Sequence, residues 1–373
     1  MLPKIFIKSK NGQIVGLAPM DGVTDSAFRQ IVKKYGDPDI MFTEFEHVSA
    51  IINSPNKVLK TLHYDEIERP IIAQIYGNNP DQFYYVSKLV CALGFDGIDI
   101  NMGCPAKNVV NSGSGAGLIK TQDLAIEIIK AVKRGVSDWV KTQKIDNEKF
   151  KHFDFIEEEI KRKKTKETEK LVNNINKFNS QGWYGLNNLH CKEKFCIPVS
   201  VKTRLGYDEL VTESWISKIS TGDPDWITVH GRTLKQMYAP VANWNEIAKA
   251  VKCTNIPILA NGDVNSIDDF NKILEKTNAY GVLIGRASFG NPWIFKEIKT
   301  QSKVNVLFIE RLRVLLEQAE KFVSIYGSTF FVSLRKHFGW YINGFQGAKE
   351  VREKLMKISN LEELKNELYQ FIK

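Results

Sequence analysis

The run Gly97-Ile98-Asp99-Ile100-Asn101-Met102-Gly103-Cys104-Pro105 begins as an apolar strand and ends abruptly in polar and small residues. It presents a thiol, Cys104, at the end of a buried strand. The small residues at 113–117, Gly-Ser-Gly-Ala-Gly, then allow the backbone to approach a flat ligand closely. A cysteine that packs as a small hydrophobe is the alternative interpretation. The rest of the chain favours an active-site loop.

Seven further apolar runs resemble this one, and several of them end in Gln, Lys, His, Asn or Arg. The eight runs cover residues 14–17, 40–42, 71–75, 97–100, 199–201, 226–229, 258–260 and 282–284. Short continuous apolar runs are typical of buried parallel strands. Helical patterns separate most of them, with Asp25 and Ser266 as N-caps of two helices. The alternation predicts an α/β fold, a (β/α)8 TIM barrel.

Composition limits the class of protein. Of 373 residues, 43% are hydrophobic, which is ordinary for a globular protein, and the formal net charge is +9. An excess of positive charge is compatible with a polyanionic partner such as nucleic acid. Five cysteines at irregular positions do not indicate a disulfide framework. With neither a signal sequence nor a membrane span in the chain, we expect a cytoplasmic protein that has no membrane contact and is a monomer.

Two domains are predicted. Residues 1–300 form the barrel, which a Lys-rich, partly helical insertion at about 137–197 interrupts on the face opposite the active site. His190, Cys191 and Cys196 within this insertion are a poor match to the spacing of zinc ligands, so we expect no metal site. The basic run at 161–166 favours a solvated surface over an RNA contact.

Residues 301–373 form a small helical bundle. Apolar positions at three-to-four spacing predict helices over 307–326, 330–342, 348–358 and 361–372. The second of these carries Arg335, Lys336 and His337 beside Trp340 and Tyr341. Cations mixed with aromatic rings suit a phosphate backbone and splayed bases. A surface patch of cations beside core aromatics explains the same residues equally well.

The strand ends indicate a phosphorylated ligand with a flat ring. Asn261-Gly262-Asp263 and Gly285-Arg286 follow the seventh and eighth strands, where barrels often bind phosphate. Pro19-Met20-Asp21 after the first strand offers an apolar shelf and exposed backbone, and Gln74 after the third can pair with an amide-like ring edge.

Lys202 and His230 end the fifth and sixth strands. A cation there suits the pyrimidine end of a flavin, which becomes negative on reduction. A Schiff-base lysine is the alternative, because barrel aldolases also place a lysine at a strand end.

Six motifs together resemble the tRNA-dihydrouridine synthases, in order and spacing, across almost the whole chain apart from the insertion. They are Ala18-Pro19-Met20-Asp21-Gly22-Val23-Thr24-Asp25, Asn101-Met102-Gly103-Cys104-Pro105, Val201-Lys202-Thr203-Arg204-Leu205-Gly206, Val229-His230-Gly231-Arg232-Thr233, Asn261-Gly262-Asp263 and Gly285-Arg286-Ala287. Asp21 stands where the family often has a small residue, and the insertion is not expected of the family.

The resemblance implies an FMN-dependent enzyme that reduces uridines of the tRNA D-loop, with NADPH or NADH as the source of electrons. It implies that FMN is held by Pro19, Met20, Asp21, Gln74, Lys202, His230, Asn261, Gly262, Asp263, Gly285 and Arg286. Cys104 corresponds to the proton donor, Asn101 and Arg204 to residues that meet the uridine, and the bundle, with Arg335, Lys336 and His337, to the tRNA-binding domain.

The chemistry of the residues agrees with this implication. A thiol with an ordinary pKa of about 8.5 is mostly protonated at neutral pH, so Cys104 can act as an acid without activation. Two other functions stay open: a flavin-dependent reductase of a free pyrimidine, similar to a dihydroorotate dehydrogenase, and a non-catalytic RNA-binding protein that keeps the barrel as a scaffold. The bundle and the basic charge favour tRNA over a small molecule. Retention of Cys104 and the flavin-site residues argues against a scaffold.

Overall fold

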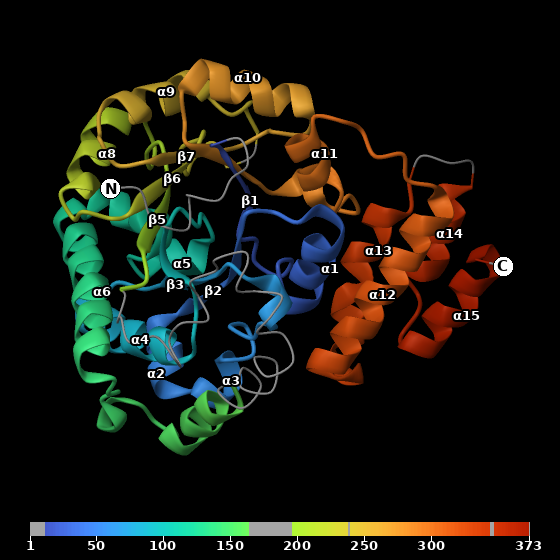
Figure 1. The fold of residues 1–373 in the computed structure, drawn as a ribbon, viewed down its shortest axis with the longest axis horizontal. Coiled ribbons are helices and arrows are strands. Elements are labelled where there is room, and N and C mark those ends of the chain that lie inside the picture. Colours follow the sequence, from blue (N-terminus) through green and yellow to red (C-terminus); the bar gives the residue numbers. More distant parts are fainter. Residues whose placement is uncertain (1–11, 164–195, 238, 344–346, 373) are drawn as a thin grey trace, which may run out of the picture.

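The eight predicted strands form one closed parallel barrel in the order of the sequence (Figure 1). The computed structural model describes residues 12–163, 196–237, 239–343 and 347–372. The strands are β1 (Ile14–Leu17), β2 (Ile40–His47), β3 (Ile71–Tyr76), β4 (Gly97–Met102), β5 (Val199–Arg204), β6 (Trp226–His230), β7 (Ile258–Asn261) and β8 (Gly281–Ile284). β8 pairs with β1 and closes the ring. The barrel prediction is confirmed, although β2 continues five residues beyond its predicted end.

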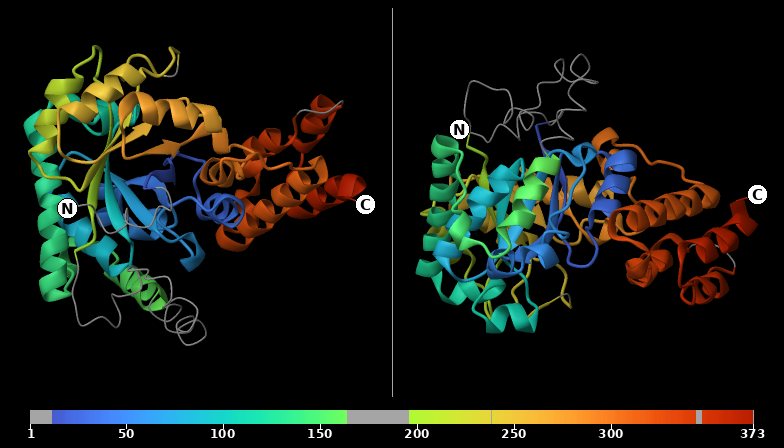
Figure 2. Two further views of the ribbon diagram at one scale, coloured as in Figure 1. Left: turned by 45° about the horizontal axis from the view of Figure 1, so that its top comes forward. Right: turned by 90° about the horizontal axis from the view of Figure 1, so that it is seen from below.

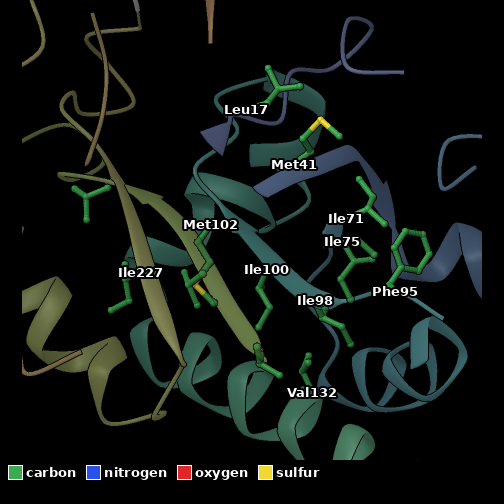
Figure 3. Close-up of a cluster of buried hydrophobic side chains, with 14 of the residues drawn as sticks. Leu17, Met41, Ile71, Ile75, Phe95, Ile98, Ile100, Met102, Val132 and Ile227 are labelled. Carbon is green, nitrogen blue, oxygen red and sulfur yellow. The ribbon is translucent and has the colours of Figure 1, made fainter. Parts of the chain in front are cut away.

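Alternation along the strands divides the core into two layers. Ile98 and Ile100 of β4 pack with the helices outside the barrel, and Figure 3 shows them in that cluster. Inside the barrel a second cluster fills the lumen, formed by Ile14, Ala18, Ile40, Phe42, Ile72, Trp226, Leu259 and Leu283. Successive side chains of a strand point to opposite faces, so Asp99 and Asn101 point into the barrel above that apolar plug.

Helices surround the strands. They are α1 (Ser26–Gly36), α2 (Val48–Asn53), α3 (Pro55–Val58), α4 (Pro80–Ala92), α5 (Lys107–Asn111), α6 (Gln122–Thr142), α8 (Thr212–Ser220), α9 (Trp244–Lys252), α10 (Ile267–Thr277) and α11 (Ile294–Thr300). The predicted caps are present: the Asp25 side chain accepts from Phe28 N–H, and that of Ser266 accepts from Asp269 N–H. None of the described helices is long and apolar enough to cross a membrane.

The insertion begins after α6 and leads to the start of β5, so it connects elements on the face opposite the carboxyl ends of the strands. Its first part packs on the barrel through the buried side chains of Phe150 and Ile156, and residues 153–163 are helical. Lys163 donates to the Tyr64 carbonyl. His190 and Cys191 lie outside the described residues. Within the described part of the chain, no group of three His, Cys, Asp or Glu residues could hold a metal ion.

The carboxyl-terminal residues form a helical domain beside α1 (Figures 1 and 2). Its helices are α12 (Phe308–Tyr326), the 3₁₀ helix η7 (Ser328–Leu334), α13 (Arg335–Tyr341), α14 (Ala348–Leu355) and α15 (Leu361–Ile372). The single helix predicted over 330–342 is therefore wrong, because its first turns belong to η7. α12 packs against α1, and Ala27 and Ile31 of α1 belong to the core of the bundle.

Polar contacts reinforce this junction. Tyr326 Oη accepts from Ser26 N–H at 3.0 Å, and Glu317 accepts from Lys34 Nζ and Tyr35 Oη, both at 2.8 Å. The bundle thus lies against the helix that follows the β1 loop, and its own residues come close to that loop.

Candidate active site

The carboxyl ends of the strands bring the predicted polar residues into one ring. The register pairs Asn101 of β4 with Lys202 of β5, and His230 of β6 with Asn261 of β7. Gln74 of β3 bonds to Asn101, since Asn101 Nδ2 donates to Gln74 Oε1 at 3.1 Å. Residues separated by almost 190 positions in the sequence therefore share one inner wall of the barrel mouth.

Cys104 lies just beyond β4 in a turn that Asn101 holds. Asn101 Oδ1 accepts from the N–H groups of Gly103 at 3.0 Å and Cys104 at 2.9 Å. Gly115 supports the other side, where φ is +56° and an added Cβ would lie 3.0 Å from the Cys104 carbonyl oxygen. Burial raises the pKa of the Cys104 thiol, so the thiol is neutral at pH 7. Partly exposed, protonated and fixed, Cys104 can donate a proton into the mouth.

Lys202 carries an ammonium group inside the barrel. Burial first, and then Arg204, lower its pKa to about 8. Within the described part of the chain, no oxygen accepts a hydrogen bond from Lys202 Nζ. Thr228, its register partner on β6, has a buried hydroxyl that also has no hydrogen-bond partner among the described residues. Buried polar groups are rarely left unpaired, so this wall fits a ligand rich in hydrogen-bond acceptors and donors.

The ends of β7 and β8 fit a phosphate. Gly262 has φ +129°, and a Cβ added there would lie 2.8 Å from Ala242 Cβ, so only glycine fits. Asp263 binds Arg232 at 2.6 Å and Arg286 at 2.8 Å. Burial opposes the charge, but the hydrogen bonds from Ala242 N–H and Arg232 hold the pKa of Asp263 below its usual value. Asp263 therefore orients the two arginines, which leaves positive charge at the rim.

His230 is held neutral beside this rim. Burial first, and then Lys202 and the neighbouring arginines, place the pKa of His230 well below its ordinary value. Arg232 Nη1 lies 3.3 Å from His230 Nε2, which makes Nε2 the acceptor. Because the His230 ring is neutral and Nε2 accepts, Nδ1 carries the ring proton and can donate a hydrogen bond.

The β1 loop meets the end of β8. A Cβ added to Gly285 would lie 3.3 Å from Met20 Sδ. Met20 and Pro19 are half-buried, whereas Asp21 is exposed. The Met20 carbonyl accepts from Val23 and Thr24 N–H, which closes the turn. The loop that carries Pro19 and Met20 therefore borders the glycine at the end of β8, where the sequence predicts a flat ring.

Arg204 is almost fully buried, and its guanidinium bonds to backbone. Nε donates to the Gly103 carbonyl at 2.7 Å, and Nη1 donates to the Thr233 carbonyl at 3.1 Å. Arg204 therefore stabilises the turn that carries Cys104.

The three predicted residues of α13 differ from one another in their surroundings. Lys336 is exposed, and an added Cβ on Gly22 would lie 2.8 Å from its Nζ, so the bundle places a cation at the β1 loop. Arg335 Nε donates to the Ile358 carbonyl at 2.7 Å. His337 is only 1% exposed, and so the prediction that it contacts RNA is wrong.

His337 belongs to the junction of the two domains. Its Nδ1 lies 2.9 Å from Gln318 Nε2, and its ring packs edge-on against Phe28 of α1. Burial lowers the pKa of His337 to about 3. Aromatic and basic residues are mixed along α13, so the sequence alone did not indicate which of them face the core and which face outward.

Several polar residues near the mouth were not predicted from the sequence. β2 extends through Thr43-Glu44-Phe45-Glu46-His47, where alternating polarity concealed the strand. Burial first, and then Asp25, raise the pKa of Glu44 to about 7. Arg232 stood in a motif, but its bond to Asp263 depends on the closure of β6 against β7.

Taken together, the mouth offers hydrogen-bonding groups for a flat heterocycle, a phosphate rim and a neutral thiol. The Lys202 ammonium, from which no oxygen of the described residues accepts a hydrogen bond, and Gly262, where only glycine fits, are compatible with a flavin mononucleotide. Lys202 would hold the ring, and Gly262, Gly285 and Arg286 would hold the phosphate.

Comparisons with known proteins place the chain in a family. A family model described as dihydrouridine synthase (Dus) matches residues 16–160 and 187–373, and the gap between them falls inside the predicted insertion. "Probable tRNA-dihydrouridine synthase" of Staphylococcus aureus (strain COL) is 32% identical over 365 residues, covering 95% of this chain and 92% of that protein. "Probable tRNA-dihydrouridine synthase 2" of Bacillus subtilis (strain 168) is 31% identical over 358 residues, covering 94% and 91%.

Among solved structures, the DHODH of Eimeria tenella in complex with ferulenol is 14% identical with a TM-score of 0.48, covering 87% of this chain and 89% of that chain. The family assignment does not depend on that likeness. It depends on the family model and the curated relatives, which span nearly the whole chain and include every motif at the barrel mouth. The chain belongs to the dihydrouridine synthase family.

Proposed function

We propose that this protein is a tRNA-dihydrouridine synthase that reduces uridines of the D-loop to 5,6-dihydrouridine, with bound FMN and with NADPH or NADH as reductant. The observation that carries the proposal is the neutral Cys104 thiol, held by Asn101 on the ring that also bears Lys202, whose ammonium has no hydrogen-bond acceptor among the described residues. When bound, FMN supplies the hydride that a thiol, lysine and amide cannot supply themselves.

Reduction of the uracil ring adds a hydride at carbon 6 and a proton at carbon 5. Cys104 fits the proton donor, because burial keeps the sulfur protonated until the developing negative charge on carbon 5 withdraws the proton. The resulting thiolate lies within electrostatic reach of Arg204 and Lys202. These cations stabilise the thiolate until water protonates it again.

Lys202 and Gln74 fit the heterocycle of the cofactor. An ammonium beside the pyrimidine end would stabilise negative charge there, and burial first, then Arg204, lower the pKa of Lys202 to about 8. A Schiff base at Lys202 would use the same lowered pKa. The phosphate rim and the family of the chain favour the flavin role.

The tRNA must present a uridine that has left the base stack, because the reacting groups lie inside the barrel mouth. Lys336 lies against the β1 loop at this mouth and Arg335 precedes it on α13, so the bundle can bind the phosphate backbone beside the entering base. The net charge of +9 supports an anionic partner of this kind.

Anaerobic half-reactions test the proposal. The purified protein is loaded with FMN, reduced with NADPH, and mixed with tRNA that lacks dihydrouridine, while flavin absorbance is followed and the nucleosides are analysed by mass. We expect the flavin to be reoxidised as dihydrouridine forms in the D-loop. Reoxidation of the flavin by a free pyrimidine but not by tRNA would indicate that the protein is a small-molecule reductase instead. Failure to bind any flavin would favour a scaffold.

A further inference from the structure

A directed chain of hydrogen bonds runs along the inner wall of the barrel, over the neighbouring strands β3 and β4, from a buried carboxylate to the backbone of Cys104. Ser200 Oγ and Gln74 Nε2 both donate to Asp99, the latter at 2.7 Å. Gln74 Oε1 accepts from Asn101 Nδ2, and Asn101 Oδ1 accepts from Gly103 and Cys104 N–H. Three side chains from two strands thus connect the inner wall of the barrel to the turn that carries the thiol.

The direction of the chain follows from the chemistry of its ends. Backbone N–H groups only donate, so the atom of Asn101 that faces Gly103 and Cys104 must be the oxygen. The Asn101 amide nitrogen therefore faces Gln74, which must present its oxygen there. The nitrogen of Gln74 is left facing Asp99, and only an acceptor satisfies it. An acceptor at position 99, here the Asp99 carboxylate, is the terminus that the whole chain requires.

The partners in this chain matter because its side chains are buried. Asp99 and Ser200 are fully buried and Gln74 is 1% exposed, so no bulk water can replace a lost partner. Lys202 is the cation near Asp99, and it lowers the cost of the buried charge without a direct hydrogen bond. If the acceptor at position 99 is lost, the amide of Gln74 becomes free to turn, and Asn101 loses the group that fixes its own amide.

We propose that Asp99 is a positioning residue for the reduction: it fixes the amides of Gln74 and Asn101 and thereby the turn that places the Cys104 thiol. Arg204 grips the same turn from the opposite side through the Gly103 carbonyl. Asp99 fixes the orientation of the Gln74 and Asn101 amides, whereas Arg204 bonds to this turn at the Gly103 carbonyl. The proposal rests on the proposed function for its kinetic consequences, but its structural consequence is independent of any substrate.

Three variants of the full chain test it. Asp99→Ala removes the acceptor. Asp99→Asn keeps an acceptor, because its oxygen can face Gln74 while its nitrogen donates to Ser200 Oγ. Ser200→Ala is the matched control. Ser200 is as buried as Asp99, and its substitution removes the other hydrogen bond to Asp99 while the bond from Gln74 stays. Hydrogen exchange of the Gly103 and Cys104 amides is measured by mass spectrometry on a peptide containing both, together with the melting temperature.

We expect exchange at these two amides to be at least about tenfold faster in Asp99→Ala, the equivalent of about 1.4 kcal/mol. It should stay within about threefold of the natural protein in Asp99→Asn and Ser200→Ala. In the tRNA assay, kcat of Asp99→Ala should fall by roughly 10²-fold, with KM for tRNA within about threefold, because misplacing a reacting group by about 1 Å costs this much.

Unchanged exchange in a folded Asp99→Ala protein overturns the proposal, as does equal acceleration in all three variants. If Asp99→Ala does not fold, Gln74→Met interrupts the same chain at its centre, and exchange like that of the natural protein there overturns it as well. A natural protein that is inactive on tRNA would remove the proposed function, yet the exchange comparison would still decide the role of Asp99.

Discussion

Acid should weaken the junction between barrel and bundle through His337. The ring is an acceptor at Nδ1, where it faces Gln318 Nε2, while Tyr341 Oη donates to Gln318 Oε1 at 2.9 Å and keeps that amide from turning. A proton on Nδ1 would therefore face another donor in a buried site. Burial first, and then the charge of Lys336, lower the pKa of His337 to about 3.

The pKa of His337 differs between the folded and unfolded chain, so the free energy of unfolding depends on pH. The unfolded chain binds a proton at this position near the ordinary pKa of about 6.5, whereas the folded chain does not until about pH 3, so stability falls as the pH is lowered between those values. From pH 7 to pH 5 the loss attributable to His337 is about 2 kcal/mol, at about 1.36 kcal/mol for each pH unit below 6.5.

Urea unfolding at pH 7 and pH 5 measures this loss. His337→Asn keeps an acceptor beside Gln318 and has no titrating ring, so its free energy of unfolding should fall by about 2 kcal/mol less than that of the natural protein over the same interval. The raised pKa values of Asp25 and Glu44 act in the opposite sense, because folded carboxyls bind protons first, and the comparison between proteins cancels them. His152→Asn, at an exposed position, is the control. Identical losses in the natural protein and His337→Asn would refute the buried, neutral histidine.

Three further outcomes test the site. Cys104→Ala should keep bound FMN and its reduction by NADPH but lose about 10²-fold to 10⁴-fold in tRNA reduction, measured as flavin reoxidation; full activity would exclude Cys104 as the acid. Gly262→Ala should abolish FMN retention on purification, because its Cβ would meet Ala242 at 2.8 Å at a φ of +129°; retention at normal stoichiometry would remove the phosphate assignment. The double variant Arg335→Ala, Lys336→Ala should weaken tRNA binding while NADPH oxidation stays unchanged. The slope of the logarithm of the tRNA binding constant against the logarithm of the salt concentration should become less steep by up to about two. An unchanged slope would show that the RNA binds elsewhere.

Sequence alone determined the architecture and the chemical groups at the mouth. Eight apolar runs with polar ends are a local pattern, and each strand could be recognised without knowing its neighbours. The motif that ends in Cys104 was likewise sufficient to predict a thiol at the carboxyl edge of a barrel, because parallel strands present those ends on one face. The helical domain followed from its three-to-four spacing.

Only the tertiary structure decided which partner each polar side chain has. Arg204 bonds to Gly103, 101 residues away, and so holds the Cys104 turn, although its position in a motif suggested a contact with substrate. His337 and Lys336 are adjacent in sequence, yet one is buried against α1 and the other is exposed at the mouth. The chain from Asp99 to Cys104 exists only because β3 and β4 lie side by side. Periodicity along a chain encodes which face a residue occupies, but hydrogen-bond partners depend on distances between strands and helices that closure of the fold creates.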